Sequence, residues 1–307
     1  MKRVIGISET VFDILFRNNK PIAGVPGGSV FNGLISLGRI GINGCVITEA
    51  GDDQVGHIIT DFMTDNGVSD RYVTRIPGKK SAVSLAFLDE NDDAHYSFYK
   101  DYQNNRLEFA RPDVGPDDVV MFGSYYALNP VLRPQVGDFL RYAKSRGAIL
   151  YYDINFRQNH SQERDSLMDT IHENFMLADI VRGSSDDFMI LFDENNGESV
   201  WENHISHYCS SFIYTRGADG ADVFSGDFRK HYPSLSIKTV STIGAGDNFN
   251  AGIVYGIVRH DIPSAEISHL PSETWDRLIG YGIAFGSEVC QSTDNYISPE
   301  FAEKYRI

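Results

Sequence analysis

The sequence predicts an α/β fold with a largely parallel sheet and crossover helices. Short β-rich runs alternate with helical patterns along most of the chain, which is typical of parallel strands connected by helices. Two segments interrupt this alternation and carry no helical pattern of their own. The chain has 307 residues, of which 42% are hydrophobic, so it can bury a large core.

Each element has its own local signal. The predicted strands are short runs rich in β-branched and aromatic residues: residues 3–8, 45–48, 148–154, 178–181, 211–215 and 237–240. The predicted helices have apolar residues at helical spacing: residues 29–40, 55–67, 247–258 and 274–291. Gly67 ends the second helix, because glycine readily adopts the left-handed conformation that stops a helix.

The two interrupting segments are residues 12–25 and 72–102. Both look like hairpins, with polar turns at residues 17–20 and 89–93 between β-rich runs. Extended segments inside an α/β domain suggest a small sheet that stands off the main body as a lid over a ligand cleft. No repeat or low-complexity linker divides the chain. We therefore expect residues 1–307 to form a single domain with an inserted β lid.

Charge and cysteine usage exclude several classes of protein. The chain has 27 basic and 42 acidic residues, and its net charge of -15 disfavours nucleic acid and anionic membranes as partners. Its three cysteines are too far apart for a disulfide framework or a paired zinc spacing. No run approaches the roughly 18 apolar residues of a membrane span, and no export signal is visible. A cytoplasmic protein is expected.

The stretch VSTIGAGDNF, residues 240–249, is the main candidate for chemistry. Gly244, Ala245 and Gly246 open a predicted helix, so their N–H groups and the helix dipole form an anion site. Such a site stabilises the charge of a transferred phosphoryl group. Asp247 directly follows, where a carboxylate would orient an acceptor hydroxyl and accept its proton. Taken alone, the motif fits a tight strand-to-helix turn equally well.

Two other glycine motifs do not fit. A dinucleotide fingerprint needs a third glycine where Phe249 stands, and too little chain follows for a full dinucleotide half. GKKS at residues 78–81 has neither the spacing of a P-loop nor a following helix. Phosphate binding would therefore depend on the GAGD stretch.

The GAGD stretch resembles the second signature of the ribokinase family, the PfkB-type carbohydrate kinases. The matching positions are Thr242, Gly244, Ala245, Gly246, Asp247 and Phe249. Residues 26–56, with their Gly-Gly pair, are similar to the first signature of the family. The resemblance covers nearly the whole chain. It implies a three-layer α/β/α domain with a β lid, ATP and Mg²⁺ as cosubstrates, and transfer of the γ-phosphate to a sugar hydroxyl.

The resemblance also implies roles for individual residues. Asp247 is the implied base, and Gly244, Ala245 and Gly246 are the implied anion hole. The implied sugar-binding positions are Asp13, Gly27, Gly28, Asn32 and Arg157, with the nucleotide phosphates as the alternative partner of Arg157. Apart from the resemblance, Phe98 is a candidate to close over the sugar as a lid residue. The implied nucleotide-binding positions are Ser184, Thr215, Gly217 and Gly220. Asp187 is expected to act on Mg²⁺ through water. Outside the family context, Asp13, Asn32 and Phe98 fit structural roles at least as well.

Departures from the family pattern affect the predicted chemistry. Ser241 stands where most relatives have the Asp linked to a monovalent cation, so that cation is in doubt. Ser184 and Asp187 replace the Asn and Glu of an N-x-x-E motif. Asp153, Asn155 and Arg157 form a D-x-N-x-R pattern similar to the fructokinase and 2-keto-3-deoxygluconate kinase branch.

The resulting prediction is an ATP-dependent sugar kinase that acts on a ketohexose such as fructose. In FYKD, Lys100 stands where a keto-acid kinase would carry Arg, which weakens a carboxylate clamp. The alternatives are a 2-keto-3-deoxygluconate kinase, a nucleoside kinase of the same fold, or a sugar-binding sensor without turnover. The apolar run at residues 82–88 of the lid predicts a homodimer formed through this sheet.

Overall fold

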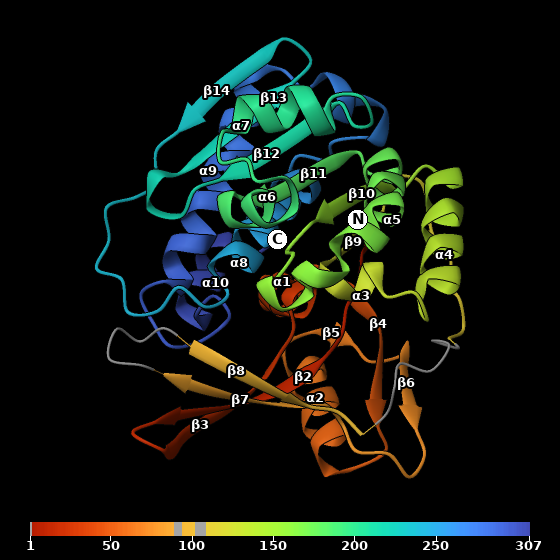
Figure 1. Ribbon diagram of the computed structural model, residues 1–307, viewed down its shortest axis with the longest axis vertical. Helices are drawn as coiled ribbons and strands as arrows, with labels where there is room; N and C mark the ends of the chain where they lie inside the picture. The colour runs from red at the N-terminus through yellow and green to blue at the C-terminus, as the bar shows by residue number, and fades with distance from the viewer. Residues whose placement is uncertain (1, 89–93, 102–108) are drawn as a thin grey trace.

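The centre of the protein is a mainly parallel sheet covered by helices on both faces (Figure 1). The computed structural model describes residues 2–88, 94–101 and 109–307. Within these ranges the sheet has ten strands in the order β14-β13-β12-β11-β10-β9-β1-β4-β5, with β6 also paired to β4. All pairs from β5 to β12 are parallel, and β13 and β14 extend the sheet as an antiparallel hairpin.

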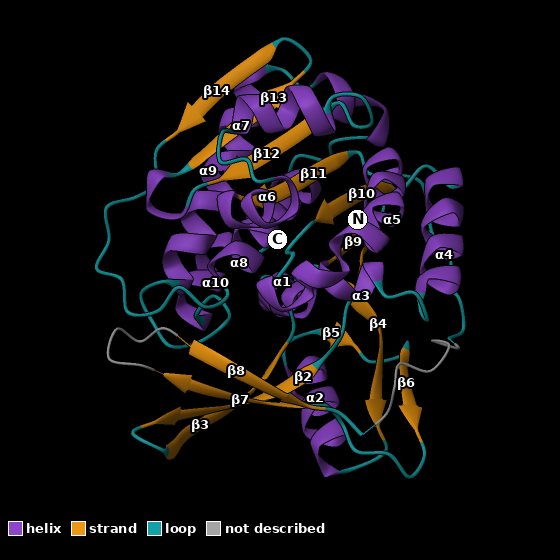
Figure 2. Cartoon of the chain, in the orientation of Figure 1, coloured by secondary structure: helices purple, strands orange, loops and turns teal. Residues whose placement is uncertain are grey.

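The strand bounds are as follows: β1 Val4–Ile7, β4 Gly44–Gly51, β5 Val68–Ser69, β6 Val73–Ile76, β9 Val119–Gly123, β10 Ile149–Asp153, β11 Ile180–Ser184, β12 Ser211–Thr215, β13 Ala221–Ser225 and β14 Phe228–Tyr232. The helix bounds are α1 Ser29–Arg39, α2 Gln54–Asp65, α3 Ser124–Leu128, α4 Arg133–Ser145, α5 Arg164–Leu177, α6 Ser185–Phe192, α7 Gly197–Val200, α8 Ala245–Arg259, α9 Ser272–Val289 and α10 Pro299–Tyr305. Figure 2 shows how helices and strands are distributed.

Alternation along the strands divides the core into two layers. In β9, Val119 and Met121 pack with α1, α8 and α9, whereas Val120 and Phe122 pack with α3, α4 and α5 on the opposite face. Successive strand residues point to opposite faces, so a strand covered on both sides is apolar throughout. The predicted three-layer α/β/α fold is confirmed. Among the described residues, no helix is long and apolar enough to cross a membrane.

A second, four-stranded sheet lies beside the main body (Figure 1). Its strands are β2 Val11–Arg17, β3 Lys20–Gly27, β7 Val83–Leu88 and β8 Ala94–Tyr99, in the order β3-β2-β7-β8. The β2–β7 pair is parallel, and the outer pairs are antiparallel. We call this sheet the lid. The predicted turn at residues 89–93 lies outside the described residues.

Two local predictions differ from the structure. Residues 237–240 are not a strand and pair with none of the described strands of the sheet. The N–H groups of Val240 and Ser241 donate instead to the Cys290 carbonyl. β6 falls within the segment 72–102 but pairs with β4. Because β5 covers only two residues of β4, the rest of that edge needs another partner, and β6 provides it.

Candidate active site

The candidate site lies where the first turn of α8 meets the carboxyl ends of the parallel strands and the lid. In open α/β sheets, this end of the strands is where ligands bind. The structure brings together residues from α1, α8, β10, β11 and the lid, although they are up to 234 positions apart, from Asp13 to Asp247.

The two glycines of GAGD are required for different reasons. Gly244 caps α8 with φ 78°, a left-handed conformation that favours glycine, and a β-carbon there would lie 2.9 Å from the Asn295 carbonyl oxygen. Gly246 lies inside the first helical turn, and a β-carbon there would lie 3.0 Å from Nη2 of Arg182. Ala245 begins the helix between them. The N-terminus of α8 is thus held closely on both sides by other parts of the chain.

Asp247 is hydrogen-bonded to Asn32, which comes from α1. Nδ2 of Asn32 donates to Oδ2 of Asp247 at 2.7 Å. The pKa of Asp247 is raised to about 7, chiefly by burial and in smaller part by Asp153, against the lowering effect of Asn32, Arg157 and Arg182. A carboxylate with a pKa near neutrality is suited to accept and release a proton. Oδ1 of Asn32 is buried and has no partner in the described part of the chain, so it can accept a bond from a ligand.

The lid contributes a second buried carboxylate. Asp13 on β2 is 9% exposed and accepts a hydrogen bond from the Ser84 hydroxyl on β7. Burial raises the pKa of Asp13 to about 6, with Ser84 lowering it and Glu9 raising it. A β-carbon on Gly27 would lie 2.4 Å from Oδ2 of Asp13, and one on Gly28, whose φ is 139°, would lie 2.3 Å from the Glu9 carbonyl oxygen. Glycine is therefore needed at both positions to let Asp13 and the chain near Glu9 approach.

Phe98 lies in the same cross-strand row as Asp13. The lid register pairs Asp13 with Ser84, and Ser84 with Phe98. Residues paired across neighbouring strands point to the same face, so Phe98 shares the face of Asp13. Its side chain is 62% exposed, which distinguishes it from the packed residues of the lid. Lys100 follows β8, and burial lowers its pKa while Glu9 and Glu49 raise it.

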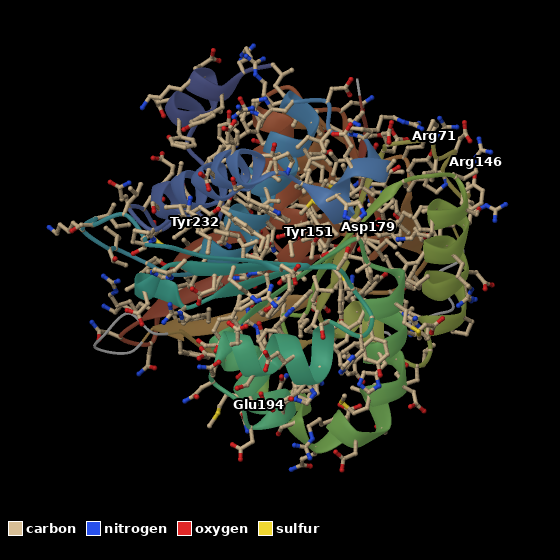
Figure 3. The ribbon with its side chains drawn as sticks, turned by 90° about the horizontal axis from the view of Figure 1, so that it is seen from above. Arg71, Arg146, Tyr151, Asp179, Glu194 and Tyr232 are labelled. Carbon is tan, nitrogen blue, oxygen red and sulfur yellow. The ribbon has the colours of Figure 1, made fainter. Side chains whose placement is uncertain are left out.

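A buried polar network that sequence reasoning missed lies below α8. Arg182 donates from Nη1 to Oδ1 of Asp153 at 2.9 Å and from Nη2 to the Thr215 hydroxyl at 2.7 Å. Nδ2 of Asn250 donates to Oδ2 of Asp153 at 2.8 Å, and Oδ1 of Asn250 accepts from the Tyr151 hydroxyl at 2.9 Å. Tyr151 lies near the middle of the molecule (Figure 3). The sequence signal was present, because an arginine inside the apolar run ADIVRGS must find a buried partner.

Ser184 and Asp187 form the N-terminal cap of α6. The Ser184 hydroxyl and N–H both donate to Oδ2 of Asp187, at 2.7 and 2.6 Å, and the Phe156 N–H donates to Oδ1 at 2.7 Å. Both carboxylate oxygens are thus engaged, and Asp187 is only 5% exposed. This arrangement does not fit direct coordination of Mg²⁺ by Asp187. No cluster of three or more acidic, His or Cys side chains in the described ranges is arranged to hold a metal.

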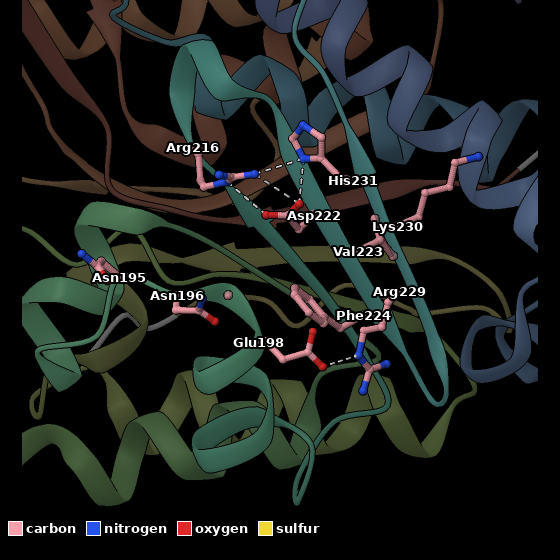
Figure 4. Close-up of a pocket in the computed structure, with 11 residues that line it drawn as sticks. Asn195, Asn196, Glu198, Arg216, Asp222, Val223, Phe224, Arg229, Lys230 and His231 are labelled. Carbon is pink, nitrogen blue, oxygen red and sulfur yellow. Dashed lines mark hydrogen bonds and ion pairs between the residues drawn. The ribbon is translucent and has the colours of Figure 1, made fainter.

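Three of the predicted nucleotide residues lie at the end of β12 and in the turn after it: Thr215 is the last residue of the strand, and Gly217 and Gly220 belong to the turn. Gly220 has φ 95°, and a β-carbon there would lie 2.0 Å from the Tyr232 carbonyl oxygen. Gly217 has φ 53° and faces open space. Arg216, between Thr215 and Gly217, is tied to Asp222 and His231 by contacts of 3.0 and 3.1 Å (Figure 4). The turn is therefore anchored to the β13–β14 hairpin.

A pocket of about 350 Å³ opens between residues 195–198 and this hairpin (Figure 4). Charged side chains that line it pair with one another, as Arg229 does with Glu198 at 3.1 Å. None of the predicted site residues lines this pocket. Arg216, between the predicted nucleotide residues Thr215 and Gly217, does line it, so the pocket borders the turn after β12.

Arg157 follows β10 and is exposed. Its guanidinium makes no hydrogen bond or ion pair within the described ranges, but its charge lowers the pKa of Asp247. The guanidinium is therefore available to a ligand beside the base.

The sequence model of the pfkB family carbohydrate kinases matches residues 7–301. The chain belongs to this family. It is 27% identical over 257 residues to the fructokinase of Rhizobium leguminosarum bv. trifolii, an alignment that covers 82% of this chain and 78% of that protein. The predicted family and the predicted sugar kinase activity are both confirmed at this level.

Solved structures share the fold of this pfkB family member. The aminoimidazole riboside kinase of Salmonella enterica, complexed with aminoimidazole riboside and an ATP analogue, has a TM-score of 0.84 at 20% identity and covers 99% of both chains. The fructokinase of Vibrio cholerae O395, in its fructose, ADP and calcium ion bound form, has a TM-score of 0.82 at 18% identity and covers 100% of this chain and 99% of that one. A double mutant of that fructokinase is known in a potassium-bound form.

Proposed function

We propose that this pfkB family kinase transfers the γ-phosphate of ATP to a hydroxyl of a neutral ketohexose such as fructose. The observation that carries the proposal is Asp247, held by Asn32 at 2.7 Å beside the N-terminus of α8 with a pKa of about 7. A base next to an anion site is the arrangement that phosphoryl transfer requires. A protein that only binds sugar has little use for it.

The proposed reaction proceeds in one displacement. Asp13 and the free Oδ1 of Asn32 accept hydrogen bonds from sugar hydroxyls and fix the orientation of the acceptor. Asp247 takes the proton of the acceptor hydroxyl, while the oxygen of this sugar hydroxyl forms a bond to the γ-phosphorus. The bond from that phosphorus to the bridging oxygen breaks, and ADP leaves. The N–H groups of residues 244–246 stabilise the charge on the transferred group.

The nucleotide is proposed to lie along the turn that contains Thr215, Gly217 and Gly220, with its phosphates directed toward α8. Mg²⁺ would neutralise the phosphate charge there, and it commonly binds through phosphates and water. Both oxygens of Asp187 are engaged by Ser184 and Phe156, so neither is free to bind the ion directly. The Ser184 hydroxyl and N–H donate to Asp187, so Ser184 is proposed to act on the nucleotide only indirectly, by holding the N-terminal cap of α6 in place.

Fructose is preferred over an acidic sugar on two grounds. Curated relatives of the chain include a fructokinase, although the identity is 27%. In addition, Glu9 acts electrostatically on Asp13 in the cleft, and Lys100 is a single point charge where a carboxylate would need a planar fork. A 2-keto-3-deoxygluconate kinase remains the alternative of the same branch. A nucleoside kinase is the other, because the fold is shared with a riboside kinase.

The decisive measurement is ADP release with ATP and Mg²⁺ over fructose, 2-keto-3-deoxygluconate and a panel of nucleosides. We expect the highest kcat/KM for fructose, with Phe98 and Arg157 contributing to its KM. A tenfold or greater advantage for the acid or for a nucleoside would overturn the substrate assignment. Sugar binding by calorimetry without ADP release from any of these would instead identify a sensor.

We also propose that the protein is a homodimer formed through the lid. The lid face opposite Asp13 carries half-buried apolar side chains, and the rings of Phe16 and Phe87 stack there with centroids 4.9 Å apart. An apolar sheet face of this kind favours association with a second copy. Light scattering should report twice 34.3 kDa. A monomer at micromolar concentration would contradict the proposal. The cytoplasmic location stays a prediction.

A further inference from the structure

Arg182 on β11 is a buried arginine whose position is set from two neighbouring strands. Its side chain lies between Asp153 at the end of β10 and Thr215 at the end of β12, and the residue is 7% exposed. One terminal nitrogen donates to each of these partners, at 2.9 and 2.7 Å. A planar guanidinium held at both terminal nitrogens has one orientation.

The guanidinium held in this way lies against the first turn of α8. An ideal β-carbon on Gly246 would lie 3.0 Å from Nη2, 3.2 Å from Nη1 and 3.4 Å from Cζ of Arg182. Contacts this short require the neighbour to move, and Arg182 is held by Asp153 and Thr215. Glycine at position 246 therefore makes room for Arg182, whether or not a ligand also approaches this backbone.

The same network reaches α8 a second time. Asp153, which pairs with Arg182, also accepts a hydrogen bond at 2.8 Å from Asn250, one turn further along α8. Arg182 Nε is buried and has no partner in the described part of the chain. A buried ion pair with an unsatisfied donor is poor evidence for stability, since apolar residues in its place are often as stable. The arrangement is better explained by what it positions.

We infer that Arg182 is a positioning residue for phosphoryl transfer, which sets the first turn of α8 through Gly246 and places a fixed positive charge behind the anion site and Asp247. The inference rests on the proposed role of Asp247 as the base. It adds a requirement that is not visible in the GAGD motif, namely a fixed arginine behind Gly246. The glycine at 246 and the arginine at 182 form one unit, because neither residue can change without affecting the other.

The charge environment of Asp247 supports this role. The charged and titratable groups that act on Asp247 from the surrounding elements are Asp153, Arg157 and Arg182, and Tyr296 lies close enough to be affected by it. Arg157 is exposed, whereas Arg182 is buried and fixed. Loss of the Arg182 charge would leave Asp153 without its cation. The lost positive charge and the unpaired negative charge of Asp153 would both raise the pKa of Asp247.

The test is a double-mutant cycle between Gly246→Ala and Arg182→Lys. Gly246→Ala should move the guanidinium by a few tenths of an ångström, which strains its bonds to Asp153 and Thr215 and shifts the first turn of α8, and should lower kcat by about tenfold. Arg182→Lys keeps the positive charge and removes Nη1 and Nη2, the atoms that a β-carbon at position 246 would contact too closely. The double variant should therefore recover most of the Gly246→Ala loss, with a coupling of about threefold or more.

A pH profile separates positioning from simple stability. Arg182→Met should move the acid limb of kcat/KM to higher pH, because Asp247 loses a nearby positive charge. The matched control is Tyr151→Phe, which removes a buried hydroxyl from the far end of the same network without changing charge. It should leave the acid limb in place. If Arg182→Met does not fold, the cycle above carries the test, because Arg182→Lys keeps Asp153 paired.

Two results would overturn the inference. One is strict additivity in the cycle, which would mean that Gly246 serves only a ligand that approaches its backbone. The other is an unmoved acid limb in a folded Arg182→Met variant. Melting temperatures of the same four proteins report the contact between Gly246 and Arg182 without any substrate. A wild-type protein that phosphorylates no sugar, yet shows coupling in its melting temperatures, would contradict the proposed function and leave the contact intact.

Discussion

The two carboxylates of the candidate site, Asp247 on α8 and Asp13 on the lid, differ in what surrounds them. Burial raises the pKa of both, to about 7 and about 6. Asp247 lies near two arginines, Arg157 and Arg182, and is backed by a buried network that spans three strands. Asp13 accepts a hydrogen bond from the Ser84 hydroxyl, and the charged neighbour that acts on it, Glu9, is of the same sign.

The difference in surroundings indicates a difference in role. A group that takes a proton during phosphoryl transfer benefits from nearby positive charge, which stabilises its ionised form and the transferred phosphoryl group. A group that only holds sugar hydroxyls needs lone pairs and a fixed position. We therefore expect Asp247 to control kcat and Asp13 to control the KM for sugar.

The largest effect is expected for Asp247→Asn. Removing the base should lower kcat by about 10²-fold or more, the scale of losing general base catalysis, while sugar binding is kept. The measurement is steady-state ADP release together with the sugar Kd by calorimetry. Asp169→Asn, an exposed acid on α5, is the matched control and should retain full activity. Near-normal turnover in Asp247→Asn would remove this residue from the mechanism.

A smaller effect is expected for Asp13→Asn. Replacing a charged acceptor by a neutral one should raise the KM for sugar by about tenfold or more, the size of a hydrogen bond to a charged group. The change in kcat should be much smaller than for Asp247→Asn. Ser84→Ala, which removes only the hydroxyl that donates to Asp13, should raise KM less. The reverse pattern, with kcat lost and KM kept, would contradict the division of roles.

The pH dependence should separate the two groups further. Activity should fall as the pH falls through about 7, because Asp247 then becomes protonated. Its raised pKa also means that folding favours the neutral form, so the stability contributed by this group is lost as the pH rises through about 7. Asp247→Asn should therefore melt at a higher temperature than wild type at pH 8. The advantage should disappear toward pH 4, and a constant difference across this range would refute the assignment.

The smallest effect is expected when potassium replaces sodium. Ser241 offers no carboxylate beside the anion site, and its hydroxyl accepts a hydrogen bond from the Ile243 N–H at 3.2 Å. A monovalent ion beside Ser241 and the N-terminus of α8 would therefore lack a charged ligand. Turnover should hardly change when one ion replaces the other. A many-fold, saturable activation by potassium would show that other oxygens complete such a site.

The sequence alone was sufficient for the family, the alternation of strands and helices, and the position of Asp247 behind two glycines. These are local signals, since a helix start and a run of small residues are visible within ten positions. The pairing of Asn32 with Asp247 follows from helix packing between α1 and α8 and was not predicted, since the family resemblance implied only a separate role for each residue. The strand predicted at residues 237–240 is absent, because the N–H groups of Val240 and Ser241 bond to the Cys290 carbonyl after α9, a distant partner that no local pattern records.

The tertiary structure decided what the sequence could not express. It placed Arg182 against Gly246, Ser84 on Asp13, and Asn250 on Asp153, pairs separated by 64, 71 and 97 positions. It also used the carboxylate of Asp187 as a helix cap, where the sequence suggested a role near Mg²⁺. Distances between side chains far apart in the chain depend on how sheet and helices pack, and no local pattern records them. The sequence determined which groups are available for the chemistry, and packing determined which of them meet.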